Sequence, residues 1–452
     1  MKVLLIRPPR RDRYDVSLAV PPLGLVYLGG ALRGAGHGVE LLDARAEGMG
    51  WGSLGARIAD TQADLVGITA SSPVRDLAAR AAVAARPHCR WLIMGGPHPT
   101  AVGADALRDN PGLDACVEGE AEISGPEALD WLSAGSQGDP PAGVRAPGHS
   151  FTPRSPPASL DALPTPARDL LPRRGYHHLL ATQLPMATVL TSRGCPHGCT
   201  FCDRAVGGTH WRARSAEHVL NELDALVGTG VRFVHFYDDN FTHDRQRVAA
   251  ICEGLIQRGS TLRWNCEARV DGVDAALLRL MKRAGCSLVA FGVESGWEPT
   301  LQTLGKGFGR AAVERAFAQA RAAGVRTLAY VILGAPGEGP AQIDATLRFC
   351  RHLRADFAQF STLSALPGSS LGAQTDGLAD VRSFVDADLK RAVVTDMPPD
   401  ELARWLRRAW FGFYLRPFSL LRLGRSAAVS GVWRESPRLV GAAAAWWLGA
   451  RR

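Results

Sequence analysis

The feature that most constrains the fold is an alternation of short apolar runs with helical stretches. It occurs in two series, separated by a segment rich in Pro, Gly and Ser. Strands that alternate with helices predict βαβ units and a parallel sheet. At 452 residues the chain is long enough for two such domains and a smaller third region. We therefore expect an α/β protein divided into residues 1–133, 134–174, 175–378 and 379–452.

The first series, residues 1–133, predicts a doubly wound parallel sheet of the Rossmann-like kind. Its expected strands are Val3–Arg7, Val39–Asp43, Asp64–Thr69, Trp91–Gly95 and Asp114–Val117. Its expected helices are Leu23–Ala35, Val74–Ala85 and Ala101–Arg108. Residues 134–174 carry no sustained hydrophobic period, so we expect a linker there.

The second series, residues 175–378, contains six expected strands with helices between them and predicts a partial (β/α)6 barrel of the TIM type. The active site is then expected at the carboxyl ends of its strands. The expected strands are Ala187–Thr191, Val231–Tyr237, Arg263–Glu267, Leu288–Val293, Arg326–Leu333 and Asp356–Leu363. The expected helices are Ala216–Val227, Arg245–Arg258, Val273–Ala284, Arg310–Ala323 and Gln342–Leu353. Residues 379–452 should form a small helical C-terminal region, which holds Trp405, Trp410, Trp433, Trp446 and Trp447.

Composition limits the cellular context. The net charge of +8 comes from an Arg-rich chain, but no basic run interleaved with aromatics precedes residue 400, so we expect no nucleic-acid partner. Nine cysteines without a signal peptide indicate a reducing compartment. No apolar stretch reaches the roughly 20 residues that a membrane span needs. We therefore expect a cytoplasmic protein.

Three closely spaced cysteines carry the strongest chemical signal. Cys195, Cys199 and Cys202 lie on one short loop directly after an expected strand. Their thiolates can bind three irons of a cubane cluster. The fourth iron then stays open to chelate the amino and carboxylate groups of S-adenosylmethionine (SAM). A zinc site completed by His197 or His210 is the alternative, although no second Cys pair of the usual spacing follows.

Four loops follow expected strands of the first series and are rich in Gly, Pro, Ser or Glu. Gly permits close approach of the backbone to a ligand, and helix N-termini bind phosphate groups. In a doubly wound sheet, ligands bind at the carboxyl ends of the strands. The pattern therefore indicates a large planar ligand with a phosphate-bearing tail. The loops are Pro21–Gly24, Ala70–Ser72, Gly95–Thr100 and Glu118–Glu122.

The cysteine loop, its place after a strand and Phe201 before the last cysteine together resemble the radical SAM superfamily. The resemblance implies a [4Fe-4S] cluster on Cys195, Cys199 and Cys202, SAM as co-substrate, and Phe201 near the SAM adenine. Four further segments occur in the order that the superfamily leads one to expect: Tyr237–Thr242, Arg269–Asp271, Phe291–Gly296 and Ile332–Glu338.

The same resemblance implies further SAM contacts. Asp238 and Asp239 match a small acidic motif that could meet the α-amino group, although capping of the following helix is an alternative for both. Glu294 and Ser295 resemble residues that face the ribose hydroxyls.

Two more residues complete the expected SAM site. Arg269 could pair with the SAM carboxylate through its planar guanidinium, or it could be a surface arginine. Gly334 would shape a backbone edge for the adenine. The sequence identifies no catalytic residue apart from these ligands.

The first series resembles the cobalamin-binding domains that precede some radical SAM barrels. The resemblance covers nearly all of residues 1–133 and lies in the loops already described. No Asp-x-His-x-x-Gly sequence is present to supply a lower axial histidine, so His98 is expected to be a loop residue and not that ligand. The cobalamin contacts that the resemblance implies are Leu23, Gly24, Ser71, Ser72, Gly95, Gly96, Pro97, His98, Gly119 and Glu120.

A cobalamin-dependent radical SAM enzyme of this kind is expected to methylate an unactivated carbon of a small-molecule or natural-product substrate. Cyclisation or rearrangement without net methyl transfer is the alternative, and a non-enzymatic electron carrier is a third. The expected partners are a small molecule, which could be apolar, and an electron donor such as flavodoxin or ferredoxin. Peripheral membrane contact through the Trp-rich C-terminus is not favoured over packing on the barrel.

The remaining cysteines are expected to be core or surface residues, because their spacing suggests no partners. Cys266 is the exception to watch, since it adjoins Glu267 on a strand that should line the barrel. A small buried apolar side chain is still its expected role.

Overall fold

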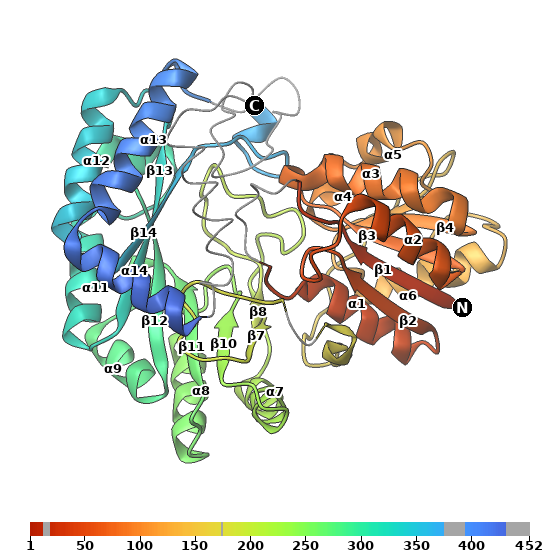
Figure 1. Cartoon of the computed structure of the whole chain (residues 1–452), viewed down its shortest axis with the longest axis horizontal. Helices are drawn as coiled ribbons and strands as arrows, with labels where there is room; N and C mark the ends of the chain where they lie inside the picture. Colours follow the sequence, from red (N-terminus) through yellow and green to blue (C-terminus); the bar gives the residue numbers. More distant parts are fainter. Residues whose placement is uncertain (12–18, 173–174, 375–393, 431–452) are drawn as a thin grey trace. The chain divides into compact units, whose positions relative to one another are not determined.

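The structure, a computed structural model, describes residues 1–11, 19–172, 175–374 and 394–430 (Figure 1). The chain divides into two units. The first comprises Met1–Tyr176 with Asp203–Gly208 and Leu366–Ser369, and the second comprises the other residues.

The described residues of the first unit include a six-stranded sheet in the order β2-β1-β3-β4-β5-β6. Strands β1 to β5 are parallel, and β6 is antiparallel to β5. The sheet is doubly wound, as the sequence predicted, and the order of its first five strands is the flavodoxin-like one. The strands are β1 Lys2–Arg7, β2 Gly38–Asp43, β3 Leu65–Thr69, β4 Trp91–Gly95, β5 Ala115–Val117 and β6 Val144–Arg145.

Helices cover both faces of this sheet, so its central strands are apolar on both sides. In β1, Leu4 and Ile6 join one apolar cluster, whereas Val3 and Leu5 join another. The helices are α1 Leu23–Gly34, α2 Trp51–Thr61, α3 Arg75–Ala85, α4 Pro97–Val102, α5 Ala104–Asp109 and α6 Ala121–Ser133. The sequence prediction did not include α2 and α6, and it joined α4 and α5 into one helix.

The second unit is built on a parallel sheet in the order β14-β13-β12-β11-β10-β7, in which every strand lies beside its neighbour in the chain. This sequential order is that of the predicted partial barrel (Figure 1). The strands are β7 Met186–Val189, β10 Phe233–Phe236, β11 Arg263–Ala268, β12 Cys286–Glu294, β13 Arg326–Leu333 and β14 Phe357–Thr362. The helices between them are α7 Ala216–Gly228, α8 Arg245–Gln257, α9 Ala275–Arg283, α10 Glu298–Thr303, α11 Arg310–Ala322 and α12 Pro340–Leu353.

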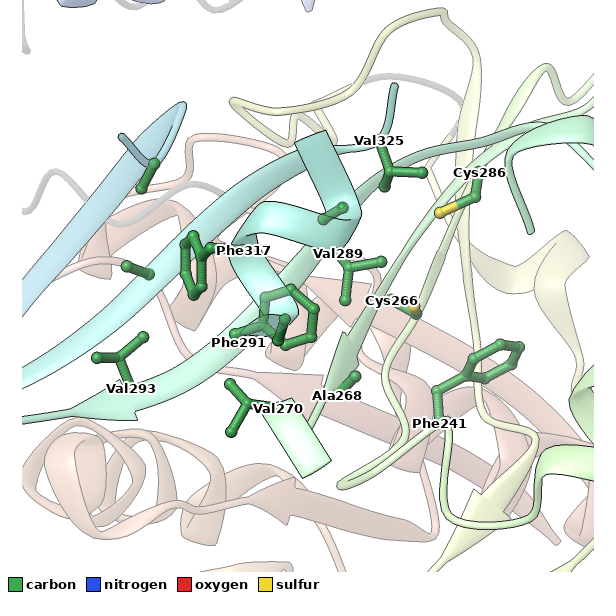
Figure 2. Close-up of a cluster of buried hydrophobic side chains, with 14 of the residues drawn as sticks. Phe241, Cys266, Ala268, Val270, Cys286, Val289, Phe291, Val293, Phe317 and Val325 are labelled. Carbon is green, nitrogen blue, oxygen red and sulfur yellow. The ribbon is translucent and has the colours of Figure 1, made fainter. Parts of the chain in front are cut away.

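The main core of this unit lies between the sheet and these helices. Phe291 of β12 meets Phe317 of α11 there, with ring centroids 5.4 Å apart (Figure 2). Cys266 and Cys286 lie in the same apolar cluster (Figure 2). Burial raises the pKa of the Cys266 thiol well above its ordinary value, as does its neighbour Cys286. Cys266 is therefore a core residue, and the adjacent Glu267 points to the opposite face.

Helix α13 (Pro399–Tyr414) packs on the edge strand β14, where the Tyr414 hydroxyl donates to the carbonyl oxygen of Ala358 over 2.7 Å. Helix α14 (Pro417–Val429) follows, and the Ser426 hydroxyl donates to the carbonyl oxygen of Leu179. Residues 379–393 and 431–452 of the expected C-terminal region, with Trp433, Trp446 and Trp447, lie outside the described residues. Among the described helices, none combines the length and the apolar character needed to span a bilayer.

Candidate active site

The cysteine loop begins and ends in a short antiparallel ribbon. Strand β8 (Ser192–Arg193) pairs with β9 (Arg212–Ala213) directly after β7. The buried Arg247 of α8 joins the two sides, because its Nε donates to the carbonyl oxygen of Arg214 and its Nη2 to that of Thr191, each over 2.8 Å. Arg247 is a positioning residue that the sequence prediction missed, since nothing in its local pattern separates it from other arginines on helices.

The middle of the loop is attached to the turn after α10. The amide of Thr200 donates to the carbonyl oxygen of Leu304 over 3.1 Å. Gly305 has a φ of +67°, and a Cβ atom there would lie 2.4 Å from the carbonyl oxygen of Gly198. Only glycine allows this close approach between the two backbones.

The three cysteines of the loop are free thiols, and each is half-buried. Burial raises the pKa of the Cys195 thiol, to which the nearby Asp239 charge also contributes. In the described residues, no group of three His, Cys, Asp or Glu side chains converges on one point as a single metal ion requires. A cubane cluster makes no such demand, because each thiolate binds a different iron. This donor set therefore fits the cluster.

The structure separates the roles of the two neighbouring aspartates. Asp238 is fully buried, and it accepts hydrogen bonds from the Thr191 amide, the Thr191 hydroxyl and the Ser192 hydroxyl. It therefore holds the start of the cysteine loop. Asp239 is exposed, and it accepts a hydrogen bond from the Gly194 amide. Crowding by protein atoms and the charges of Asp238 and Glu267 raise its pKa.

Arg269 is buried, which excludes the surface-arginine alternative. Its guanidinium makes a bidentate contact with Asp271, at 2.9 and 2.7 Å, and donates to the carbonyl oxygen of Lys306 over 2.7 Å. The Nη1 atom has no hydrogen-bond partner among the described residues. A buried guanidinium N–H without an acceptor fits an anionic ligand group such as the SAM carboxylate.

Glu294 ends β12 with a φ of +62° and forms a buried ion pair that the sequence did not suggest. Its Oε1 lies 2.9 Å from Nζ of Lys306, and both side chains are less than a tenth exposed. Burial opposes the charge of Lys306, but Glu294 and Cys199 outweigh it and raise the lysine pKa. The ammonium also lies 5.7 Å from the centre of the Phe201 ring, which packs on an apolar cluster.

Ser295 and Gly334 are both buried, and both are hydrogen-bonded within the second unit. The buried Ser295 hydroxyl is 3.0 Å from the Thr346 hydroxyl and accepts from the Trp297 amide. The Gly334 amide donates to Glu338 over 2.8 Å, and a Cβ at Gly334 would lie 2.8 Å from a methyl group of Leu402 in α13. This geometry favours a role for both in positioning the strand ends.

In the first unit, the predicted cobalamin contacts lie at the carboxyl end of β4 and in the loops and first helical turns that follow β1, β3, β4 and β5. The order of strands reverses between β1 and β3, which is where ligands bind in such sheets. Leu23 and Gly24 begin α1, Pro97 begins α4, and Glu120 caps α6. A Cβ at Gly24 or Gly119 would meet no atom within 4 Å, so the backbone is open to a ligand at both positions.

Two of these loops are joined by a buried hydrogen bond. The Ser72 hydroxyl lies 3.2 Å from Nδ1 of His98, and the His98 amide donates to the carbonyl oxygen of Ala70 over 3.0 Å. Burial, assisted by the charge of Arg75, lowers the pKa of His98 to about 4. His98 is therefore a neutral residue that connects the loop after β3 to the start of α4, and it lies in the first turn of that helix and not in the loop that the sequence predicted.

The turn from Gly95 to Pro97 brings the backbone after β4 close to the backbone after β3. Gly96 has a φ of +107°, and a Cβ there would lie 2.8 Å from the carbonyl oxygen of Ala70. Ser71, which precedes the turn after β3, is half-buried beside it. The loops thus provide a glycine-lined edge that fits a large ligand at the end of the sheet.

Comparison with known proteins gives two family matches. Residues 189–350 match the radical SAM superfamily, and residues 15–129 match the B12 binding domain. The chain is 32% identical over 439 residues to the uncharacterized methyltransferase PH0819 of Pyrococcus horikoshii, covering 93% of this chain and 94% of the relative. It is 27% identical to the anaerobic magnesium-protoporphyrin IX monomethyl ester cyclase of Rubrivivax gelatinosus, covering 89% of this chain and 75% of that enzyme.

A solved structure has the same fold. The radical SAM methyltransferase TsrM of Kitasatospora setae, with cobalamin and a [4Fe-4S] cluster bound, superposes with a TM-score of 0.68 at 19% identity. The match covers 82% of this chain and 74% of TsrM.

Proposed function

Because this chain belongs to the family of radical SAM enzymes with a cobalamin-binding domain, we propose that it transfers a methyl group from SAM to an unactivated carbon of a small molecule. The observation that carries the proposal is the similarity to a methyltransferase over nearly the whole of both chains. When bound, the cluster supplies the electron that cleaves SAM, and cobalamin carries the methyl group.

In the second unit, we assign the cluster to Cys195, Cys199 and Cys202. Asp239 and the unpartnered N–H of Arg269 would bind the amino and carboxylate groups of SAM. Phe201 would pack on the adenine. The remaining predicted SAM residues support these contacts: Asp238, Glu294, Ser295 and Gly334.

In the first unit, we assign cobalamin to the loops at the carboxyl ends of the strands, within residues 1–133. We do not assign His98 as a ligand to the metal of cobalamin, because its side chain is buried and hydrogen-bonded to Ser72. The residues proposed to contact cobalamin are Leu23, Gly24, Ser71, Ser72, Gly95, Gly96, Pro97, His98, Gly119 and Glu120. Residues 134–174 would connect this domain to the barrel at 175–378, and 379–452 would complete the chain.

Carbon methylation of this kind consumes two SAM molecules, one as methyl donor and one as the source of the radical. The products are methylated substrate, S-adenosylhomocysteine, 5′-deoxyadenosine and methionine. Electrons from outside are needed, and we propose reduced flavodoxin or ferredoxin as their donor in the cytoplasm. The nine free cysteines support such a reducing compartment.

The test is product analysis after anaerobic reconstitution with iron, sulfide and hydroxocobalamin. With methyl-labelled SAM, a reductant and a metabolite extract, we expect label in a small molecule. S-adenosylhomocysteine and 5′-deoxyadenosine should form together, and S-adenosylhomocysteine should require cobalamin. Omission of cobalamin is the matched control.

The similarity to a cyclase favours one alternative, cyclisation or rearrangement without net methyl transfer. In that case 5′-deoxyadenosine would form without S-adenosylhomocysteine and without transfer of label, which would contradict methylation.

A further inference from the structure

The inner face of the barrel sheet, which faces away from the helices, combines an apolar frame with one isolated carboxylate. Side chains alternate along a strand, so Glu267 of β11 lies on the face opposite Cys266. The frame is formed by Leu180, Leu288, Ala290, Leu328 and Phe357. Tyr330 of β13 packs against this frame and donates its hydroxyl hydrogen to Glu267 over 3.0 Å.

Glu267 differs from two other carboxylates at this end of the sheet because, among the described residues, it pairs with no Lys or Arg side chain. Glu294 pairs with Lys306, and Asp271 pairs with Arg269. No Lys or Arg of the described chain forms an ion pair with Glu267, although its side chain is only 33% exposed. A half-buried carboxylate has lost part of its hydration. One hydrogen bond from a neutral donor does not fully replace that hydration.

The hydroxyl that donates to Glu267 cannot serve as its counter-ion. Burial raises the pKa of Tyr330 well above its ordinary value, so its hydroxyl stays neutral. His235 Nε2 lies 3.9 Å from Glu267 Oε1, and the His235 ring stacks on His178 at 4.6 Å. Burial and the neighbouring His235 hold the pKa of His178 well below its ordinary value.

A second observation on this face also points to a polar ligand. His235 is 3% exposed, and its Nδ1 has no hydrogen-bond partner in the described residues. Thr188, its cross-strand neighbour on β7, is fully buried and its hydroxyl is likewise unpartnered. Native proteins rarely leave such groups unpaired.

We infer that Glu267, Tyr330 and His235 form a subsite for a protonated amine of the substrate. The carboxylate would supply the charge that binds the ammonium group, and His235 would accept or donate a further hydrogen bond. Aromatic rings beside the carboxylate also favour a cation. The apolar part of the amine would pack on Leu288 and Leu328. This inference rests on the proposed function, since it describes the substrate of the same barrel.

The test uses the reconstituted full chain with SAM and two probes of equal size, 2-phenylethylamine and 2-phenylethanol. Dissociation constants measured by ligand-observed NMR should favour the amine by about tenfold in the wild type. Glu267→Gln should reduce that ratio to about one. The matched control, Glu253→Gln on the exposed face of α8, should retain it.

Equal binding of amine and alcohol to the wild type, or an unchanged ratio in Glu267→Gln, would overturn the subsite. A loss of SAM affinity equal to the loss of amine affinity would also overturn it, because Glu267 would then hold SAM. If Glu267→Gln does not fold by circular dichroism, Glu267→Met provides the same comparison. Cobalamin-dependent S-adenosylhomocysteine and 5′-deoxyadenosine, measured in the same wild-type samples, show separately whether the proposed function holds.

Discussion

The ion pair of Lys306 and Glu294 illustrates how much of the candidate site depends on single buried side chains. Both members are almost fully buried, and the ammonium lies near Phe201 and the cysteine loop. A buried pair of charges contributes little net stability, but loss of one member leaves the other uncompensated. The pair is therefore expected to be needed for the local structure around SAM.

We predict that Lys306→Met lowers the free energy of unfolding by about 3 kcal/mol, because Glu294 is left buried without a counter-ion. The double variant Lys306→Met/Glu294→Gln should recover more than half of that loss. Lys282→Met, on the exposed side of α9, is the control. Chemical denaturation of the three variants measures these differences, and a double variant no more stable than Lys306→Met would refute the coupling.

For single residues, the sequence predicted which residues belong to the candidate site better than it predicted what each of them does there. Asp238 and Asp239 could not be told apart, because adjacent strand-end residues differ only in which face they occupy. The structure buries Asp238 under Thr191 and Ser192 and leaves Asp239 exposed. Lys306 was missed because its partner is 12 positions away, across a turn and a short helix.

The regular elements were largely predictable from hydrophobic periodicity. Strands β4 and β13 agree with the expected bounds, and other predicted strands differ by a residue or two at their ends. The exceptions have physical reasons. Helix α2 contains Gly52 and Gly55, which lower its helix propensity, and its only buried apolar residues are Leu54 and Ile58. Strand β6 has only two residues, Val144 and Arg145, and is held by pairing with β5, which local sequence does not encode.

The link between the loops after β3 and β4 gives the first unit a predictable pH dependence. An unfolded histidine binds a proton below about pH 6.5, whereas His98 stays neutral until about pH 4. The contribution of neutral His98 to the stability of the first unit is therefore fully present above about pH 6.5, and it is lost as the pH falls towards 4. The shift corresponds to at most about 3 kcal/mol.

Native-state hydrogen exchange of the β4 amides in the full chain measures this effect. Between pH 7 and pH 4.5 we expect a fall in the free energy of opening for the wild type and a smaller fall for His98→Gln, which does not titrate. Parallel curves for the two proteins would show that His98 is not the titrating group.

For the whole molecule, the combination of two parallel sheets in one chain is more informative than either alone. The first unit has the strand order of a ligand-binding doubly wound sheet, and the second has a cysteine loop after the first strand of a partial barrel. The family matches coincide with these two regions. The sequence could predict this combination because its motifs are local. It could not predict the substrate, because the inner-face residues come from different strands.

The measurement that tests the central claim most directly is iron and sulfide analysis with electronic spectra of protein purified without oxygen. We predict about four irons and four sulfides per chain, lost when Cys195, Cys199 and Cys202 are all replaced by Ala. The half-buried Cys89, replaced by Ala, is the control and should leave the cluster intact. A wild-type protein without a four-iron cluster, or a triple variant that keeps it, would contradict the account.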